Sequence, residues 1–314
     1  MALSQIQQYL LLQAFIELDS TSPVFPSPEK AAENIASVLD VPALINSPKV
    51  HYGTKGERED LLIQIINFRY TVLSLSISDK RGPESFLFRS LIVQINNSIS
   101  SIVLLAENGY DYQAISQIRN LLELFMMLIV VIESPEKRLE VIKAHTPDDA
   151  RKVWHKHFNK TQFIKMIKPY SECFRHLVDS VDNWIEDIYK QLSSFSHNDY
   201  VNVLLYSLSA EDREGILHLN LMGNYVTRKG EIYHRLTTAI APLDLILCAL
   251  LQNPKVDICM NDLCNFEDDP FHLELSFTLN TLRDICMILY ADISNRQEIK
   301  EHIPIPFCQQ KDDS

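Results

Sequence analysis

The chain has 314 residues, of which 46% are hydrophobic and 22% charged, and its net charge is −12. This composition suits a globular protein with a well-buried core, and the acidic excess disfavours a general nucleic-acid binder. Its 7 glycines are few, because the usual share is roughly 7%. Neither a GxGxxG turn nor a glycine-rich loop ending in Gly-Lys occurs, which excludes the nucleotide enzymes that depend on them.

The N-terminal segment, 1–56, is predicted to be a helical arm and linker. It begins with an amphipathic helix at 3–19 that lacks the basic start of a secretory signal, so we expect a cytoplasmic protein. A second helix is predicted at 28–40. The Pro- and Ser-rich stretch from residue 20 to residue 55 indicates the linker.

Residues 57–252 are predicted to form the helical core. The expected helices are 57–78, 84–107, 111–133, 135–144, 147–158, 161–168, 171–195 and 229–252. Prolines indicate where several of them start, as in Gly82-Pro83, Ser134-Pro135 and Thr146-Pro147. The helix at 111–133 is apolar nearly all round, so we expect it to be central. Its apolar run of 12 residues, 121–132, is shorter than the ~20 residues of a membrane span.

The core is interrupted by a predicted β-hairpin near 201–222. Two apolar runs rich in β-formers, 201–208 and 216–222, flank a polar turn at 209–215. The remaining residues, 253–314, are expected to hold a helix at 271–292 and a fraying tail. The six cysteines include no CxxC pair, so we expect reduced, buried thiols, no disulfide and no structural zinc. The predicted fold class is all-α with one small hairpin insertion.

Two segments place polar groups on apolar helices. Arg119 and Glu123 are four residues apart and share one face of the helix at 111–133. Tyr189, Ser193 and His197 repeat that spacing about 70 residues later and form one polar line. We expect Arg119 and Glu123 to be buried or nearly so, and such groups need partners. The five groups form either one functional pocket or a structural network between two core helices.

The charge reverses locally between residues 137 and 176. This segment contains ten basic and four acidic residues, which gives it a net charge of +6. Aromatic residues are interleaved with them, a mixture that suits phosphate neutralisation and base stacking. Candidate nucleic-acid contacts are Lys152, Lys156, Lys160 and Lys165. The alternative is that the charges form solvated helix faces while the aromatic side chains point into the core.

The two polar segments resemble a known arrangement. A Gly-aromatic-x-x-x-Ala-x-x-x-x-Arg-x-x-x-Glu helix, starting at Gly109, is followed by a Tyr-x-x-Leu-Ser-x-x-x-His helix end at Tyr189. This pair of motifs resembles uncharacterised bacterial proteins related to the HEPN (higher eukaryotes and prokaryotes nucleotide-binding) superfamily. The likeness covers roughly 57–252. It implies a helical bundle, a homodimer and a role in a bacterial defence or toxin-type system.

The same resemblance implies RNA binding or metal-independent ribonuclease activity, for which the family uses an Arg-x(4 to 6)-His motif. His197, Arg119, Glu123, Tyr189 and Ser193 would then line the catalytic site, without metal or cofactor. The sequence departs from the motif, because no arginine lies four to six residues before His197. Displaced matches occur elsewhere, and Arg151 with His157 and Arg228 with His234 are the favoured two.

Two functional hypotheses follow. The first is the HEPN-like protein that binds or cleaves RNA. The alternative is a non-catalytic helical scaffold or regulator, whose acidic remainder binds a protein partner encoded in the same operon. A metal-dependent helical hydrolase is disfavoured, because the paired Glu-x-x-His motif of such bundles does not occur. No membrane partner is expected.

Overall fold

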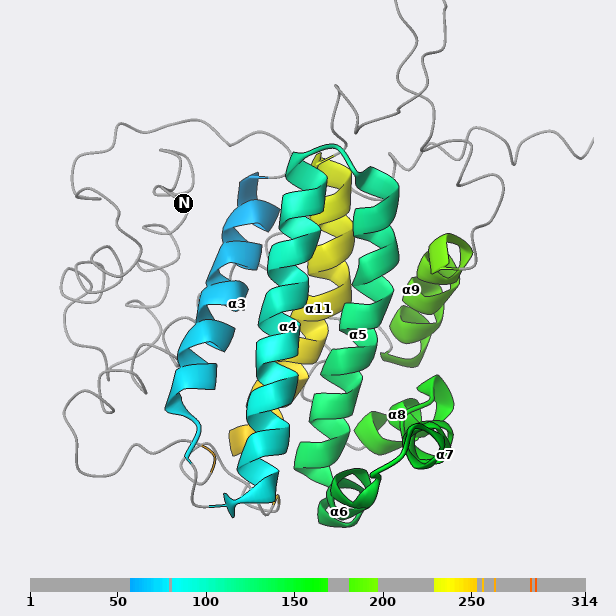
Figure 1. The fold of residues 1–314 in the computed structure, drawn as a ribbon. Helices are drawn as coiled ribbons and strands as arrows, with labels where there is room; N and C mark the ends of the chain where they lie inside the picture. Colours follow the sequence, from blue (N-terminus) through cyan, green and yellow to red (C-terminus); the bar gives the residue numbers. More distant parts are fainter. Residues whose placement is uncertain are drawn as a thin grey trace, which may run out of the picture.

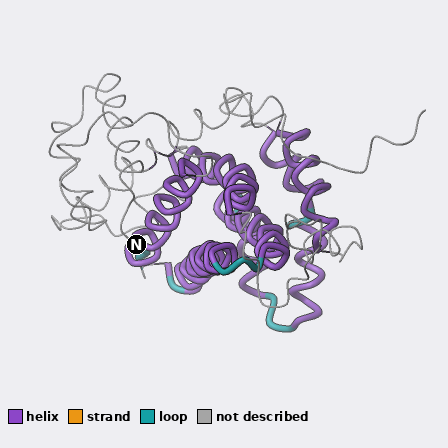
Figure 2. The backbone as a smooth tube through the Cα atoms, turned by 90° about the horizontal axis from the view of Figure 1, so that it is seen from above, coloured by secondary structure: helices purple, strands orange, loops and turns teal. Residues whose placement is uncertain are grey.

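The computed structural model describes residues 57–78, 81–168, 181–196 and 229–252, with the single residues 256, 263, 283 and 286. These residues form eight α-helices and no strand (Figures 1 and 2). The helices are α3 (Glu57–Ser76), α4 (Pro83–Glu107), α5 (Asp111–Glu133), α6 (Pro135–Lys143), α7 (Pro147–His157), α8 (Lys160–Ile167), α9 (Val181–Ser196) and α11 (Lys229–Gln252). The all-α prediction is confirmed for this part of the chain.

The four long helices α3, α4, α5 and α11 lie side by side as a bundle (Figure 1). The short helices α6, α7 and α8 follow one another at one end of α5, and α9 packs along α5. The predicted boundaries of the core helices agree with the structure to within one or two residues where it describes them, and the start of the helix predicted at 171–195 lies outside the described residues. The arm at 1–56, the hairpin near 201–222 and nearly all of 253–314 lie outside the described residues.

Proline begins three helices, as predicted. Pro83, Pro135 and Pro147 each occupy the first turn of their helix, where a missing N–H costs nothing. Thr146 caps α7, because its hydroxyl accepts a hydrogen bond from the Asp149 amide at 3.2 Å. The side chain of Ser134 makes no such cap on α6, so Pro135 starts that helix without it.

The turn between α4 and α5 depends on Gly109. Its φ is +74°, in the left-handed region that suits glycine. Its amide donates to the carbonyl of Ala106, and the next amide, of Tyr110, donates to the carbonyl of Leu105. These two bonds make a Schellman motif, which satisfies carbonyls at the end of α4. The chain therefore reverses within three residues, and α5 packs directly against α4.

Helix α5 is the central element, as predicted. It contacts α4, α11, α9, α6 and α8. By length and composition, α4, α5 and α11 could each cross a membrane, which the 12-residue apolar run does not reveal. In the structure most apolar side chains of α5 and α11 pack into the shared core of the bundle, whereas α4 leaves Phe86, Val93 and Leu104 exposed. The absence of a membrane partner and the cytoplasmic location remain predictions.

A buried ion pair links α3 to α11 inside this core. Arg69 donates through Nη1 to Asp244 and through Nη2 to the sulfur of Cys248 at 2.9 Å, and all three are buried. Burial raises the pKa of the Cys248 thiol to about 11, although Arg69 lowers it. Cys248 and Cys286 are both buried free thiols. Thiols of this kind are unreactive at neutral pH, because the thiolate is the nucleophile.

Candidate functional site

The polar side chains predicted on two helices meet where α5 packs against α9. Nη1 of Arg119 donates to the hydroxyl of Ser193 at 3.1 Å, and its Nε donates to Glu123 at 3.3 Å. The guanidinium carbon lies 5.6 Å from the ring centre of Tyr189, within range of a cation–π interaction. We call these four side chains the α5–α9 seam. Their contact is a finding, and their role in function remains a prediction.

Tyr189 holds its phenol inside the seam. The hydroxyl donates to the sulfur of Met126 at 3.3 Å. Burial raises the pKa of Tyr189 well above its usual value, the carboxylate of Glu123 raises it further, and Arg119 lowers it. The phenol is therefore neutral at physiological pH and cannot act as a base there. Its ring instead provides a wall against which the guanidinium rests.

The seam is less buried than the sequence predicts. The side chains of Arg119 and Glu123 are 22% and 26% exposed, so they lie at the edge of the core. Nη2 of Arg119 makes no hydrogen bond within the described residues. An arginine that is held through Nε and Nη1 and is partly exposed is suited to bind an anion through its remaining N–H groups.

His197 lies outside the described residues. In sequence it follows Ser196, the last residue of α9, and is four residues beyond Ser193. The structure thus brings together four of the five predicted side chains. No group of three or more His, Cys, Asp or Glu side chains that could hold a metal occurs among the residues that the structure describes.

Two aromatic residues that the sequence reasoning missed lie beside the seam. The hydroxyl of Tyr112 donates to the main-chain carbonyl of Phe195 at 2.7 Å, and their ring centres are 5.8 Å apart. Arg235 of α11 lies over the other aromatic ring, 5.7 Å from the centre of Phe195. A sequence signal existed for one of them, because Tyr112 is seven residues before Arg119 and so shares its helix face.

Residues 85–172 match the model of DUF5677, which is described as a family of unknown function. No curated protein and no solved structure matches the chain. The matched segment includes Arg119 and Glu123 but ends before α9, which supplies Tyr189 and Ser193. The likeness to DUF5677 therefore assigns no activity, and the HEPN resemblance remains a hypothesis.

The DUF5677 segment also contains the basic helices. Of the four candidate lysines, Lys156 bonds both oxygens of Glu140, at 2.8 and 2.9 Å, and Lys160 pairs with Glu186 of α9. The exposed side chains of Lys152 and Lys165 make no ion pair within the described part of the chain. They are the better candidates for contacting a ligand, because no carboxylate neutralises them.

The aromatic residues of the basic stretch face the core where the structure describes them. Phe158 and Phe163 are 2% and 0% exposed. Trp154 is partly buried and packs on Phe158, with ring centres 5.7 Å apart. Base stacking on these two phenylalanines is excluded by their burial. The alternative expectation that aromatic side chains point into the core is confirmed for these residues, and the role of the lysines stays a prediction.

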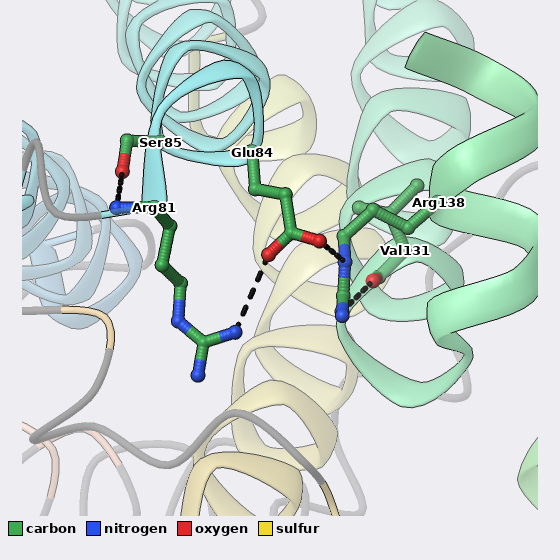
Figure 3. A network of polar contacts seen from close by, with 5 residues as sticks. All are labelled: Arg81, Glu84, Ser85, Val131 and Arg138. Atoms are coloured by element: carbon green, nitrogen blue, oxygen red, sulfur yellow. Dashed lines mark hydrogen bonds and ion pairs between the residues drawn. The ribbon is translucent and has the colours of Figure 1, made fainter. Parts of the chain in front are cut away.

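Arg138 is a basic residue of this stretch whose side chain is buried. Its side chain is 2% exposed, Nε lies 3.1 Å from Glu84 at the start of α4, and Nη1 donates to the carbonyl of Val131 at 3.0 Å (Figure 3). Arg81 pairs with the other oxygen of Glu84 at 3.3 Å (Figure 3). The carbonyl of Val131 lies in the last turn of α5, where helix carbonyls lack helical partners. Arg138 thus ties three helices together.

The displaced Arg-x(4 to 6)-His matches gain no support. Arg151 is 71% exposed and lies 4.0 Å from Asp148, while His157 is 12% exposed and bonds Glu140 at 2.8 Å. Six residues on a helix place two side chains about 120° apart, so this pair does not converge. Arg228 lies outside the described residues, and His234 lies 3.7 Å from Glu59.

Proposed function

We propose that this protein binds RNA at the α5–α9 seam and belongs functionally with the HEPN-like proteins of bacterial defence or toxin-type systems. The observation that supports binding is that Glu123 and Ser193 hold the guanidinium of Arg119 while 22% of this side chain remains exposed. A guanidinium held in one orientation contacts a phosphate at a lower entropic cost than a mobile one.

The charge distribution supports a route to this site. The chain is acidic overall, so a nucleic acid must approach over a locally basic surface. Lys152 of α7 and Lys165 of α8 are exposed and unpaired within the described residues, and both helices lie beside the end of α5. We assign them to long-range attraction of phosphate, with Lys156 and Lys160 as weaker contributors because of their carboxylate partners.

A ribonuclease activity adds one step to binding. The 2′-oxygen loses its proton and attacks phosphorus, while the P–O5′ bond breaks and the 5′-oxygen takes up a proton. The products are a 2′,3′-cyclic phosphate and a 5′-hydroxyl. We propose His197 for the proton transfers and Arg119 for the phosphate charge, since histidine titrates near neutral pH.

The experiment for binding is fluorescence anisotropy with a labelled single-stranded RNA at several salt concentrations. Arg119→Gln should weaken binding about tenfold, because it removes a charged hydrogen bond to phosphate. The slope of log K against log salt should fall by about 0.7, the value for one contact to a single strand.

Arg81→Gln is the matched control. Arg81 and Glu84 also lie 3.3 Å apart, with side chains 27% and 21% exposed, close to the values at the seam. The substitution removes the same charge but should leave RNA affinity within about twofold. Equal losses in the two variants, or no binding by the wild-type protein, would refute the proposal.

The experiment for cleavage is incubation of RNA with the protein in EDTA. His197→Ala should abolish cleavage while RNA affinity stays near that of the wild type. Intact RNA after incubation with the wild-type protein would refute the ribonuclease activity, and RNA binding would then be the whole of the proposed function.

The second candidate is a non-catalytic scaffold that binds a protein partner. The ion pairs of Lys156 and Lys160 favour it, since they reduce the positive charge offered to RNA. On this hypothesis Arg119→Gln would leave RNA affinity unchanged and would prevent recovery of one defined protein partner in a pull-down.

A further inference from the structure

Helix α11 contains an internal proline, Pro242. Proline has no N–H, so the carbonyl four residues earlier, that of Thr238, loses its usual partner in the helix. A buried carbonyl without a partner is costly, and this one faces another helix. Its acceptor is the indole of Trp184 on α9, whose Nε1 donates to the carbonyl of Thr238 at 3.0 Å.

The opposite end of α9 is held in a similar way. Phe195 lies in the last described turn of α9, near the end opposite to Trp184. The hydroxyl of Tyr112 on α5 donates to the carbonyl of Phe195 at 2.7 Å. An aromatic side chain thus donates to a main-chain carbonyl of a neighbouring helix at each contact, once from α9 to α11 and once from α5 to α9.

These two hydrogen bonds fix the position of α9 along its own axis. Eleven residues separate Trp184 from Phe195, or about 16 Å of helix. Ser193 lies between the two points, close to the second, and its hydroxyl must stay within hydrogen-bond range of Arg119. A slide of α9 by about 1 Å would lengthen that 3.1 Å contact beyond a good hydrogen bond.

We infer that Trp184, Pro242 and Tyr112 are positioning residues, which set the register of α9 and thereby bring Ser193 to Arg119. Their effect on RNA rests on the proposed function, but their effect on the register does not. Pro242 acts by withholding a main-chain donor, so its contribution is tested by restoring that donor. Pro242→Ala supplies an N–H that competes with Trp184 for the carbonyl of Thr238, and it favours the helix.

The experiment is NMR of the full chain, with two signals as readouts. The indole N–H of Trp184 should exchange slowly with deuterium in the wild type and at least about tenfold faster in Pro242→Ala, because its bond is shared. The chain has only two tryptophans, so Trp154→Phe assigns the signal and serves as the control. The Nε–H signal of Arg119 should shift in Trp184→Phe and in Tyr112→Phe, and stay unchanged in Trp154→Phe.

RNA affinity separates this inference from the proposed function. Trp184→Phe and Tyr112→Phe should each weaken binding by about three- to tenfold, and Trp184→Phe should lose most of that effect in the Pro242→Ala background. Rapid exchange of the Trp184 indole N–H in the wild type would overturn the inference. An Nε–H signal of Arg119 that shifts neither in Trp184→Phe nor in Tyr112→Phe would also overturn it. If the NMR signals change as expected but the wild-type protein does not bind RNA, the inference about the register of α9 is supported and the proposed RNA binding is refuted.

Discussion

Arg69 and Arg119 each pair with a carboxylate, but in contrasting surroundings. The first is buried between α3 and α11 with Asp244, and its side chain is 6% exposed. The second lies at the α5–α9 seam with Glu123, and 22% of its side chain remains open to solvent. The difference teaches which arginine is available: a buried guanidinium holds two helices together, while a partly exposed one can exchange water for a ligand.

The largest effect should follow from breaking the buried pair. Asp244→Ala leaves Arg69 charged and unpaired in the core, which should lower the free energy of unfolding by about 3–5 kcal/mol. Urea unfolding followed by circular dichroism measures it. Glu123→Ala is the control at the seam and should cost about 1 kcal/mol or less. If Asp244→Ala does not fold, the double variant Arg69→Met, Asp244→Leu should restore folding. Equal losses of unfolding free energy in Asp244→Ala and Glu123→Ala would contradict the contrast between the buried and the partly exposed arginine.

The next effect should come from Arg138, a second buried arginine. Arg138→Met removes its bonds to Glu84 and to the carbonyl of Val131, and should cost about 3 kcal/mol of unfolding free energy. The RNA affinity of the folded protein should not change, because this guanidinium faces α4 and α5. Thermal unfolding and anisotropy together check this. A variant of full stability and weakened RNA binding would place Arg138 at the binding surface instead.

A smaller effect is expected at the basic helices. Lys152→Gln and Lys165→Gln should each weaken RNA binding by about two- to fourfold and lower the salt slope by about 0.7, as loss of one phosphate contact does. Lys156→Gln should do less, since Glu140 already neutralises that charge. Anisotropy across a salt series ranks the three. An equal loss for Lys156→Gln would show that the Glu140 pair opens on binding.

The smallest effect concerns pH at the junction of α6 and α7. Hydrogen bonds from Lys156 and His157 lower the pKa of Glu140 below its usual value of 4.5. The carboxylate therefore stabilises the junction above that value, and the contribution is lost as pH falls through the lower, folded pKa. Amide exchange in α7 should be faster in Glu140→Gln than in the wild type at pH 6, and the two should converge in acid. Glu136→Gln, in the same helix, should behave like the wild type at both pH values.

The sequence predicted the helices well, because their signals are local. Prolines set the starts of α4, α6 and α7, Thr146 caps α7, and the apolar character of 111–133 indicated the central helix. The meeting of Arg119 with Ser193 also followed from the sequence, since each lies on a polar line along an apolar helix. Their partial exposure did not, because it depends on how α9 sits beside α5.

Other features depend on packing between distant segments. Arg138 is buried while its neighbour Leu139 is 46% exposed, the reverse of what residue type predicts. The orientation of α6 decides which of these two side chains is buried, and the local sequence of α6 does not reveal that orientation. The bond between Trp184 and the carbonyl of Thr238 joins residues 54 positions apart. Pro242 indicated that a main-chain N–H is missing from the helix, but nothing in the neighbouring sequence indicated which side chain would donate in its place.

The tight reversal at Gly109 has a consequence for how the molecule assembles. Helices α4 and α5 adjoin in sequence, so they can pair as soon as both have left the ribosome, at a small loop-closure cost. Helix α9 comes about 50 residues after α5, and α11 later still. Arg119 is therefore in place before its serine partner is synthesised, and the α5–α9 seam closes late. A chain that stalls before α9 would carry Arg119 and Glu123 without Tyr189 and Ser193.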